Sequence, residues 1–209
     1  MNTETANLYA KKVSRRSIRL KEYGYSQDGA YFITACTRAK TPYFSVYPEL
    51  KNIVQNELEM LPEHFTTISI GELIVMPNHV HTILVFDNNP DSVGATFTVA
   101  RRARSGLAPT VGDVIRVFKS LCVHRWLGYI KLNNMHAVGA FWQRNYYEHI
   151  IRSEKQLNLV REYIFINPLK WSFDNNNPDF NYDLEYSKKW RWLEGNKNTS
   201  HKPSTSSNG

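Results

Sequence analysis

The chain has 209 residues, of which 42% are hydrophobic and 22% charged, as in globular rather than disordered or fibrous proteins. Lys and Arg outnumber Asp and Glu by 26 to 19, so the formal charge is +7 and polyanionic partners are favoured. No run of 18 apolar residues occurs, which excludes a transmembrane helix. We expect no secretory signal, and Cys36 and Cys122 are typical of buried thiols in a reducing compartment, so a cytoplasmic location is predicted.

The first 24 residues form a basic arm with little apolar content. Its cations are Lys11, Lys12, Arg15, Arg16, Arg19 and Lys21. Two interpretations stay open for this arm. It is either a solvated tail or a phosphate-binding segment that becomes ordered on its partner.

The sequence of the first half of the domain predicts a strand, a helix and a hairpin, in this order. β-Forming residues predict a strand over 30–37, and apolar residues at helical spacing predict a helix from Pro48 to about Met60. Two further strands are expected over 67–75 and 80–86, joined by a short turn at 76–78 into an antiparallel hairpin.

The second half begins with a long loop and continues as helix, strand and helix. The loop at 88–110 contains Arg101, Arg102 and Arg104. A helix is predicted from Val111 to about Gly128, a fourth strand with its flanks over 141–151, and a last helix over 153–166. Ser153 and Gln156 predict a capping box at the start of that helix, and Asn167, which precedes a proline, should end it.

This order of elements predicts an α+β fold of the ferredoxin-like, split β-α-β type. The sheet is expected to be antiparallel, with helices on one face and the other face free to carry a site. Three segments are predicted: the basic arm at 1–24, one domain at 25–172, and a C-terminal extension with a disordered tail at 173–209.

His79 and His81 are the sharpest local feature. Residues two apart on a strand share a face, so the two imidazoles point the same way and can clamp a divalent metal. Two polar residues decorating a strand end are the alternative. The last helix adds Tyr163 and Asn167, which are four residues apart and therefore neighbours on one side of it, at the rim of its apolar stripe. A tyrosine hydroxyl can attack a phosphodiester when a metal polarises the phosphate.

The stretch around the predicted fourth strand has two interpretations. A packed final strand is preferred, and Arg144, His149 and Arg152 are the alternative candidates for contacts to DNA phosphates. The alternation Trp190–Arg191–Trp192 suits stacking on unpaired bases or packing of a C-terminal segment. A zinc hydrolase built on the two histidines is also conceivable, but the sequence places no carboxylate base near them.

Four segments closely resemble the single-tyrosine HUH transposases, and in particular their REP-associated branch. They are RRSIRLKEY, GELIVMPNHVHTILV, FWQRNYYEHIIR and LVREYIFINPLKW, and the resemblance covers about residues 15–172. It implies an HUH endonuclease architecture in which His79 and His81 bind Mg²⁺ or Mn²⁺, Asn167 is the third ligand and Tyr163 is the nucleophile.

The same resemblance implies the reaction and the partner. The expected activity is metal-dependent cleavage and rejoining of single-stranded DNA that bears a hairpin, such as a REP-like palindrome, through a 5′-phosphotyrosine intermediate. The arm and the cations at 101–104 are the expected DNA contacts, and the chain is expected to act in the bacterial cytoplasm, on the nucleoid, as a monomer rather than a dimer. The alternative is a ferredoxin-like module that binds structured single-stranded DNA or RNA without chemistry.

Overall fold

The computed structural model describes residues 28–87, 108–179 and 181–194. The basic arm, with Lys11, Lys12, Arg15, Arg16 and Arg19, lies outside these residues, and so do Arg101, Arg102 and Arg104 and the tail after residue 194. Within the described residues, no helix is both long and apolar enough to cross a membrane.

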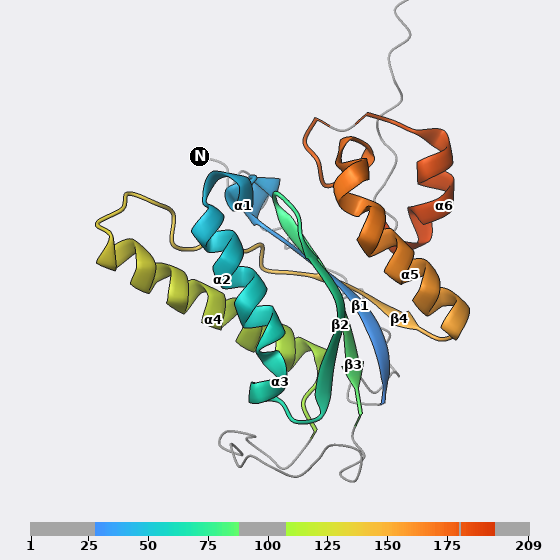
Figure 1. Ribbon diagram of the computed structural model, residues 1–209, viewed down its shortest axis with the longest axis horizontal. Helices are drawn as coiled ribbons and strands as arrows, with labels where there is room; N and C mark the ends of the chain where they lie inside the picture. Colours follow the sequence, from blue (N-terminus) through green and yellow to red (C-terminus); the bar gives the residue numbers. More distant parts are fainter. Residues whose placement is uncertain (1–27, 88–107, 180, 195–209) are drawn as a thin grey trace, which may run out of the picture.

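A four-stranded antiparallel sheet forms the centre of the molecule (Figure 1). Its strands are β1 (Gly29–Cys36), β2 (Ile68–Val75), β3 (His79–Phe86) and β4 (Tyr147–Ile151). They lie in the order β2-β3-β1-β4, and every neighbouring pair is antiparallel. This is the ferredoxin-like arrangement that the order of predicted elements implies, so the fold class is confirmed.

The helices agree with the predicted positions and add several short elements. The longer helices are α2 (Pro48–Glu59), α4 (Val111–Leu132), α5 (Glu154–Ile166) and α6 (Leu184–Glu194). The short ones are η1 (Arg38–Lys40), α1 (Tyr43–Val46), α3 (Leu61–His64) and η2 (Asn167–Phe173). The η1 turn is unusual because Ala39 and Lys40 both have positive φ, of 54° and 56°, without being glycine.

Local sequence explains where the long helices begin. Pro48 occupies the first turn of α2, where its missing N–H costs nothing. Thr110 and Asp113 form a reciprocal capping box at the start of α4. Ser153 caps α5 by accepting from the Gln156 amide, but the Gln156 side chain bonds to the Arg152 amide rather than to that of Ser153.

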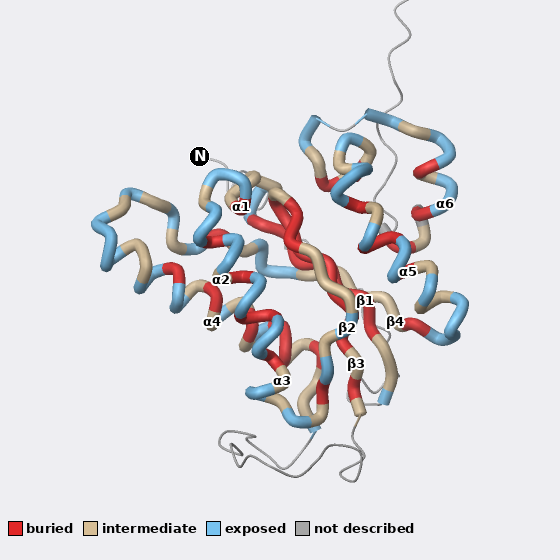
Figure 2. Tube along the Cα trace, viewed as in Figure 1, coloured by how far each residue is buried: buried red, intermediate tan, exposed pale blue. Residues whose placement is uncertain are grey.

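Helices cover both faces of the sheet, which corrects the expectation of helices on one face only. Tyr31, Ile33 and Ala35 of β1 point into a core shared with α2 and α4. Phe32 and Ile83 belong to a second core on the other side, together with residues of α5 and α6. These two helices lie on the opposite side of the sheet from α2 and α4 (Figure 1), and buried segments occur on both sides (Figure 2). Because both faces of the central strands carry apolar side chains, each face needs a helical layer to exclude water.

Candidate active site

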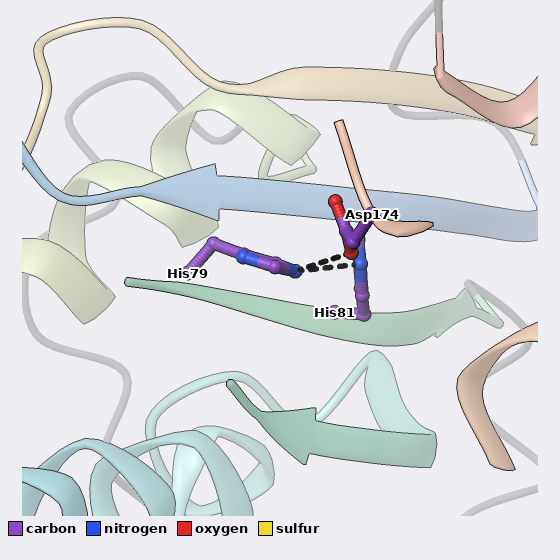
Figure 3. Close-up of side chains that lie close together, drawn as sticks. All are labelled: His79, His81 and Asp174. Atoms are coloured by element: carbon purple, nitrogen blue, oxygen red, sulfur yellow. Dashed lines mark hydrogen bonds and ion pairs between the residues drawn. The ribbon is translucent and has the colours of Figure 1, made fainter. Parts of the chain in front are cut away.

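His79 and His81 lie at the start of β3, on the face that α5 covers. Their Nε2 atoms are 2.9 Å apart and their ring centroids 4.4 Å apart (Figure 3). The expectation that strand alternation turns both imidazoles the same way is therefore confirmed. Both are buried, with His79 0% and His81 2% exposed, so they do not decorate a solvated strand end.

Asn78 fixes the protonation pattern of His79. Its Nδ2 donates to the carbonyl oxygens of Lys40, at 2.8 Å, and Asn176, at 2.7 Å. The amide oxygen is thereby left to face His79 Nδ1, 2.8 Å away, and can only accept a hydrogen bond from it. His79 Nδ1 consequently carries a proton, and Nε2 is the nitrogen that faces His81.

His81 is positioned by the neighbouring strand and by an aromatic ring. Thr34, its partner across β1, places Oγ1 2.9 Å from His81 Nδ1. The ring also stacks on Phe32 at a centroid distance of 5.2 Å. Both contacts lie away from Nε2, so this nitrogen is the one that faces His79.

Asp174 brings a carboxylate to the two imidazoles. Its Oδ2 lies 3.5 Å from His79 Nε2, and the ligand atoms of the three residues are all within 4.8 Å of one another (Figure 3). Asp174 follows η2 and is fully buried, and its Oδ1 accepts from the Asn176 amide at 2.6 Å. Asp174 therefore corrects the expectation that no carboxylate lies near the histidines.

This donor set fits a divalent metal ion. Ligands held about 2.1 Å from a shared ion are about 3.0–3.4 Å apart. The separations of 2.9 and 3.5 Å within the cluster are close to that range. The buried Asp174 carboxylate also needs a positive charge beside it for its compensation.

Tyr163 and Asn167 lie on the same side of the sheet but are buried rather than at a rim, which corrects their expected position. The Tyr163 ring is 5.2 Å from His81, 5.8 Å from Phe32 and 5.3 Å from Trp190 of α6. Tyr163 is 1% exposed because α6, which the sequence analysis did not predict, packs over it.

Asn167 follows α5 and is fully buried, and neither polar atom of its side chain has a hydrogen-bond partner. An orphaned buried amide is costly, so it marks a place where a ligand is expected. Its backbone lies in the α region although Pro168 follows, so the chain continues from α5 into η2 instead of leaving the helical path.

The described candidates for DNA contacts differ in their surroundings. Arg144 and Arg152 are exposed. His149 is half-buried, with its ring 5.1 Å from that of Trp192. Burial and the nearby Arg152 lower the pKa of His149, which favours the neutral ring.

Asn78 and Asp174 are the two site residues that sequence reasoning missed. Asn78 directly precedes the two histidines, but nothing in the spacing shows that its amide bonds to a ring nitrogen. Asp174 begins the run DNNN, just after the predicted domain end at 172. The one sequence signal that could have pointed to Asp174 is a carboxylate in a polar turn just after the last predicted helix. Trp190 and Trp192 pack against the domain, so the structure favours the packing interpretation of this segment.

Comparisons with known proteins place this chain among bacterial relatives. No protein-family model matches it. A Haemophilus influenzae protein of uncharacterised function is 37% identical over 174 residues, which cover 77% of this chain and 91% of that protein. A second protein of that organism, named "Putative REP-associated tyrosine transposase", is 24% identical over 151 residues, covering 71% and 75% of the two chains.

One solved structure with a similar name was also found. It shows a REP-associated tyrosine transposase bound to a REP hairpin. The superposed region includes 75% of this chain and 76% of the chain in that structure, with 18% sequence identity and a TM-score of 0.49.

Proposed function

We propose that this chain is a REP-associated tyrosine transposase, like the 24% identical relative that carries this name, and that it cuts and rejoins single-stranded DNA through a covalent bond to Tyr163. One observation carries the proposal. The Tyr163 ring lies 5.2 Å from His81, which belongs to a buried cluster of metal-binding groups. A phenol and a metal-binding cluster in one site are the two components that nucleophilic attack on a phosphodiester requires.

The residues have distinct roles in this proposal. His79 and His81 would hold Mg²⁺ or Mn²⁺, and Asp174 and the unpartnered Asn167 amide would offer oxygen atoms as further ligands. A metal held there would polarise the phosphate and stabilise the charge that develops on it. Asn78 and Thr34 keep the two rings oriented.

The chemical step balances without an external energy source. The Tyr163 phenol loses its proton, and a bond forms between its oxygen and the phosphorus. The bond from phosphorus to the 3′ oxygen breaks, and that oxygen takes up a proton to leave as a free 3′-hydroxyl. The phosphotyrosine retains the energy of the broken ester, so the reverse attack by a 3′-hydroxyl rejoins a strand.

We propose that the substrate is DNA with a hairpin of the REP type, bound by a monomer. The formal charge of +7 supports a polyanionic partner. Arg144 and Arg152 are exposed and available to phosphates, and the basic arm and the cations at 101–104 are the remaining proposed contacts. The name of the 24% identical relative supports this substrate class.

The test is a substitution at the nucleophile. Tyr163→Phe should abolish the covalent adduct with hairpin oligonucleotides in Mn²⁺ while leaving their binding intact, since phenylalanine keeps the ring contacts. Tyr182→Phe, which alters an exposed tyrosine, is the matched control and should still form the adduct. Denaturing gels detect the adduct, and mass spectrometry of the DNA-linked peptide identifies the tyrosine.

Two results would refute the proposal. Cleavage by the Tyr163→Phe variant would mean that another group is the nucleophile. Tight binding of palindromes from the source genome by wild-type protein, with no adduct on any of them, would favour the non-catalytic binding module.

A further inference from the structure

A short turn before β4, residues 143–145, lies one strand away from the histidines. The Gln143 amide donates to the Cys36 carbonyl oxygen at 2.9 Å, and Cys36 is the cross-strand partner of His79. Neighbouring strands of a sheet are about 4.8 Å apart, so the turn begins about 10 Å from the start of β3. A strand of DNA whose phosphate lies at the histidines can therefore reach this turn with a nearby base.

Lys119 of α4 holds the backbone of this turn. Its ammonium donates to the carbonyl oxygens of all three residues of the turn, at 2.8, 3.5 and 3.0 Å in chain order. The rings of Trp142 and Tyr146, on either side of the turn, have their centroids 5.8 and 5.9 Å from the same ammonium. These contacts fix the turn and direct its carbonyl oxygens toward α4, so its acceptors do not face a ligand at the surface.

The side chains of the turn are exposed and unpaired. They belong to Gln143, Arg144 and Asn145. Within the part of the chain that the structure describes, none of these three side chains takes part in a hydrogen bond or an ion pair. A turn with a fixed backbone and free polar side chains is suited to an external ligand, because binding then orders little of the chain.

A guanidinium between two amides matches the chemistry of a nucleic acid strand. Arginine binds phosphate oxygens, whereas asparagine and glutamine make paired hydrogen bonds to N6 and N7 of adenine. The amides are uncharged, so they act on the choice of base rather than on non-specific attraction. Helices and two-stranded ribbons are the elements that enter a major groove, so a single turn fits an unpaired base better than a base pair.

We propose that residues 143–145 form a reading turn for single-stranded DNA. The amides of Gln143 and Asn145 bind adenine in the unpaired flank of the hairpin, and Arg144 binds an adjoining phosphate. Lys119 is the positioning residue of the reading turn. The inference rests on the proposed function, because it takes DNA bound at the histidines as the substrate, and it assigns the choice of the DNA site to particular side chains.

Binding of hairpin oligonucleotides from the source genome, measured by fluorescence anisotropy without metal ions, tests the reading turn apart from catalysis. Each flanking adenine is replaced in turn by a pyrimidine or by 7-deazaadenine, which lacks N7. We expect both replacements to weaken binding by wild-type protein, the pyrimidine about tenfold, at one adenine or more. Gln143→Ala or Asn145→Ala should remove this adenine penalty. Asn52→Ala, which removes an exposed amide from α2, is the matched control and should keep it.

Two further variants separate the roles of the cations. Arg144→Ala should weaken binding of all the oligonucleotides alike and lower the slope of log affinity against log salt concentration by about 1, while the adenine penalty stays. Lys119→Met should reduce the adenine penalty but leave the affinity for the adenine-free oligonucleotide as in wild type. An equal loss of affinity for every oligonucleotide in Lys119→Met would refute its positioning role.

The outcomes distinguish the reading turn from the proposed function. The reading turn is refuted if wild-type protein shows no adenine penalty, or if the penalty persists in both Gln143→Ala and Asn145→Ala. A covalent adduct at Tyr163 in those variants would then leave the proposed function intact. Conversely, a penalty that depends on the two amides, in a protein that forms no adduct, would support the reading turn and refute the proposed chemistry.

Discussion

Asn78 joins two parts of the molecule through one side-chain amide. Its nitrogen is engaged by the carbonyl oxygens of Lys40 and Asn176, so its oxygen is fixed toward His79. That orientation selects the tautomer of His79 whose Nε2 can bind a metal. Asn78 is therefore a positioning residue rather than a ligand.

Replacing Asn78 should weaken metal binding without removing a ligand. Asn78→Ala frees the His79 ring to rotate and to change tautomer, so we expect the affinity for Mn²⁺ to fall about 10–100-fold. Calorimetric titration measures the affinity. Asn133→Ala, which removes a side-chain amide from the exposed end of α4, is the control and should bind as wild type does. Equal affinities for the two variants would contradict this role of Asn78.

α5 is the element that brings the phenol to the histidines, and its start is set by Ser153. The Ser153 hydroxyl accepts from the Gln156 amide at 3.2 Å, and the Gln156 side chain accepts from the Arg152 amide at 2.8 Å. The sequence predicted this helix and its cap because the serine, the glutamine and the apolar stripe are local signals. It did not predict that the helical path would continue into η2.

Loss of this cap should destabilise the protein by a small, measurable amount. Ser153→Ala leaves one N–H of the first turn unsatisfied, so we expect the free energy of unfolding to fall by about 1 kcal/mol. Chemical denaturation measures it. Ser45→Ala, at an exposed serine without a capping role, is the reference, and an equal loss there would contradict the assignment.

Across the whole molecule, local sequence predicted the strands and the order of the sheet but not the second helical layer. Alternating apolar residues and a short hairpin turn are local signals in the sequence, and they predict β1, β2 and β3. The contact of Trp190 with Tyr163 and the approach of Asp174 to His79 join distant segments. No periodic pattern encodes such contacts, and the position of α6 therefore could not be deduced.

Lys119 gives the stability of the whole chain a pH dependence. Its ammonium donates to the carbonyl oxygens of Gln143 and Asn145, at 2.8 and 3.0 Å, and so attaches α4 to the segment before β4. Burial lowers the pKa of Lys119 from 10.5 to about 8. Between these two values the unfolded chain binds a proton that the folded chain has lost, so folding becomes more favourable as the pH rises.

The comparison with Lys119→Met isolates this contribution. From pH 8 to 10.5 the free energy of unfolding of wild type should rise relative to that of the variant. We expect about 2 kcal/mol, less than a fully buried group would give, because Lys119 is only half-buried. Urea denaturation of both proteins across this range measures the difference. A constant difference would mean that Lys119 keeps an ordinary pKa in the folded protein.

The left-handed turn at Ala39 and Lys40 connects the residues after η2 to the histidines of β3. Residues other than glycine rarely adopt this backbone conformation, so two in succession are strained. The Lys40 carbonyl meets Asn78, and its ammonium meets Asn175. Asn78 in turn contacts His79, so Lys40 connects the segment after η2 to the histidine pair through two side chains. Removal of the Lys40 side chain would therefore loosen the segment that carries Asp174 without touching a metal-binding residue.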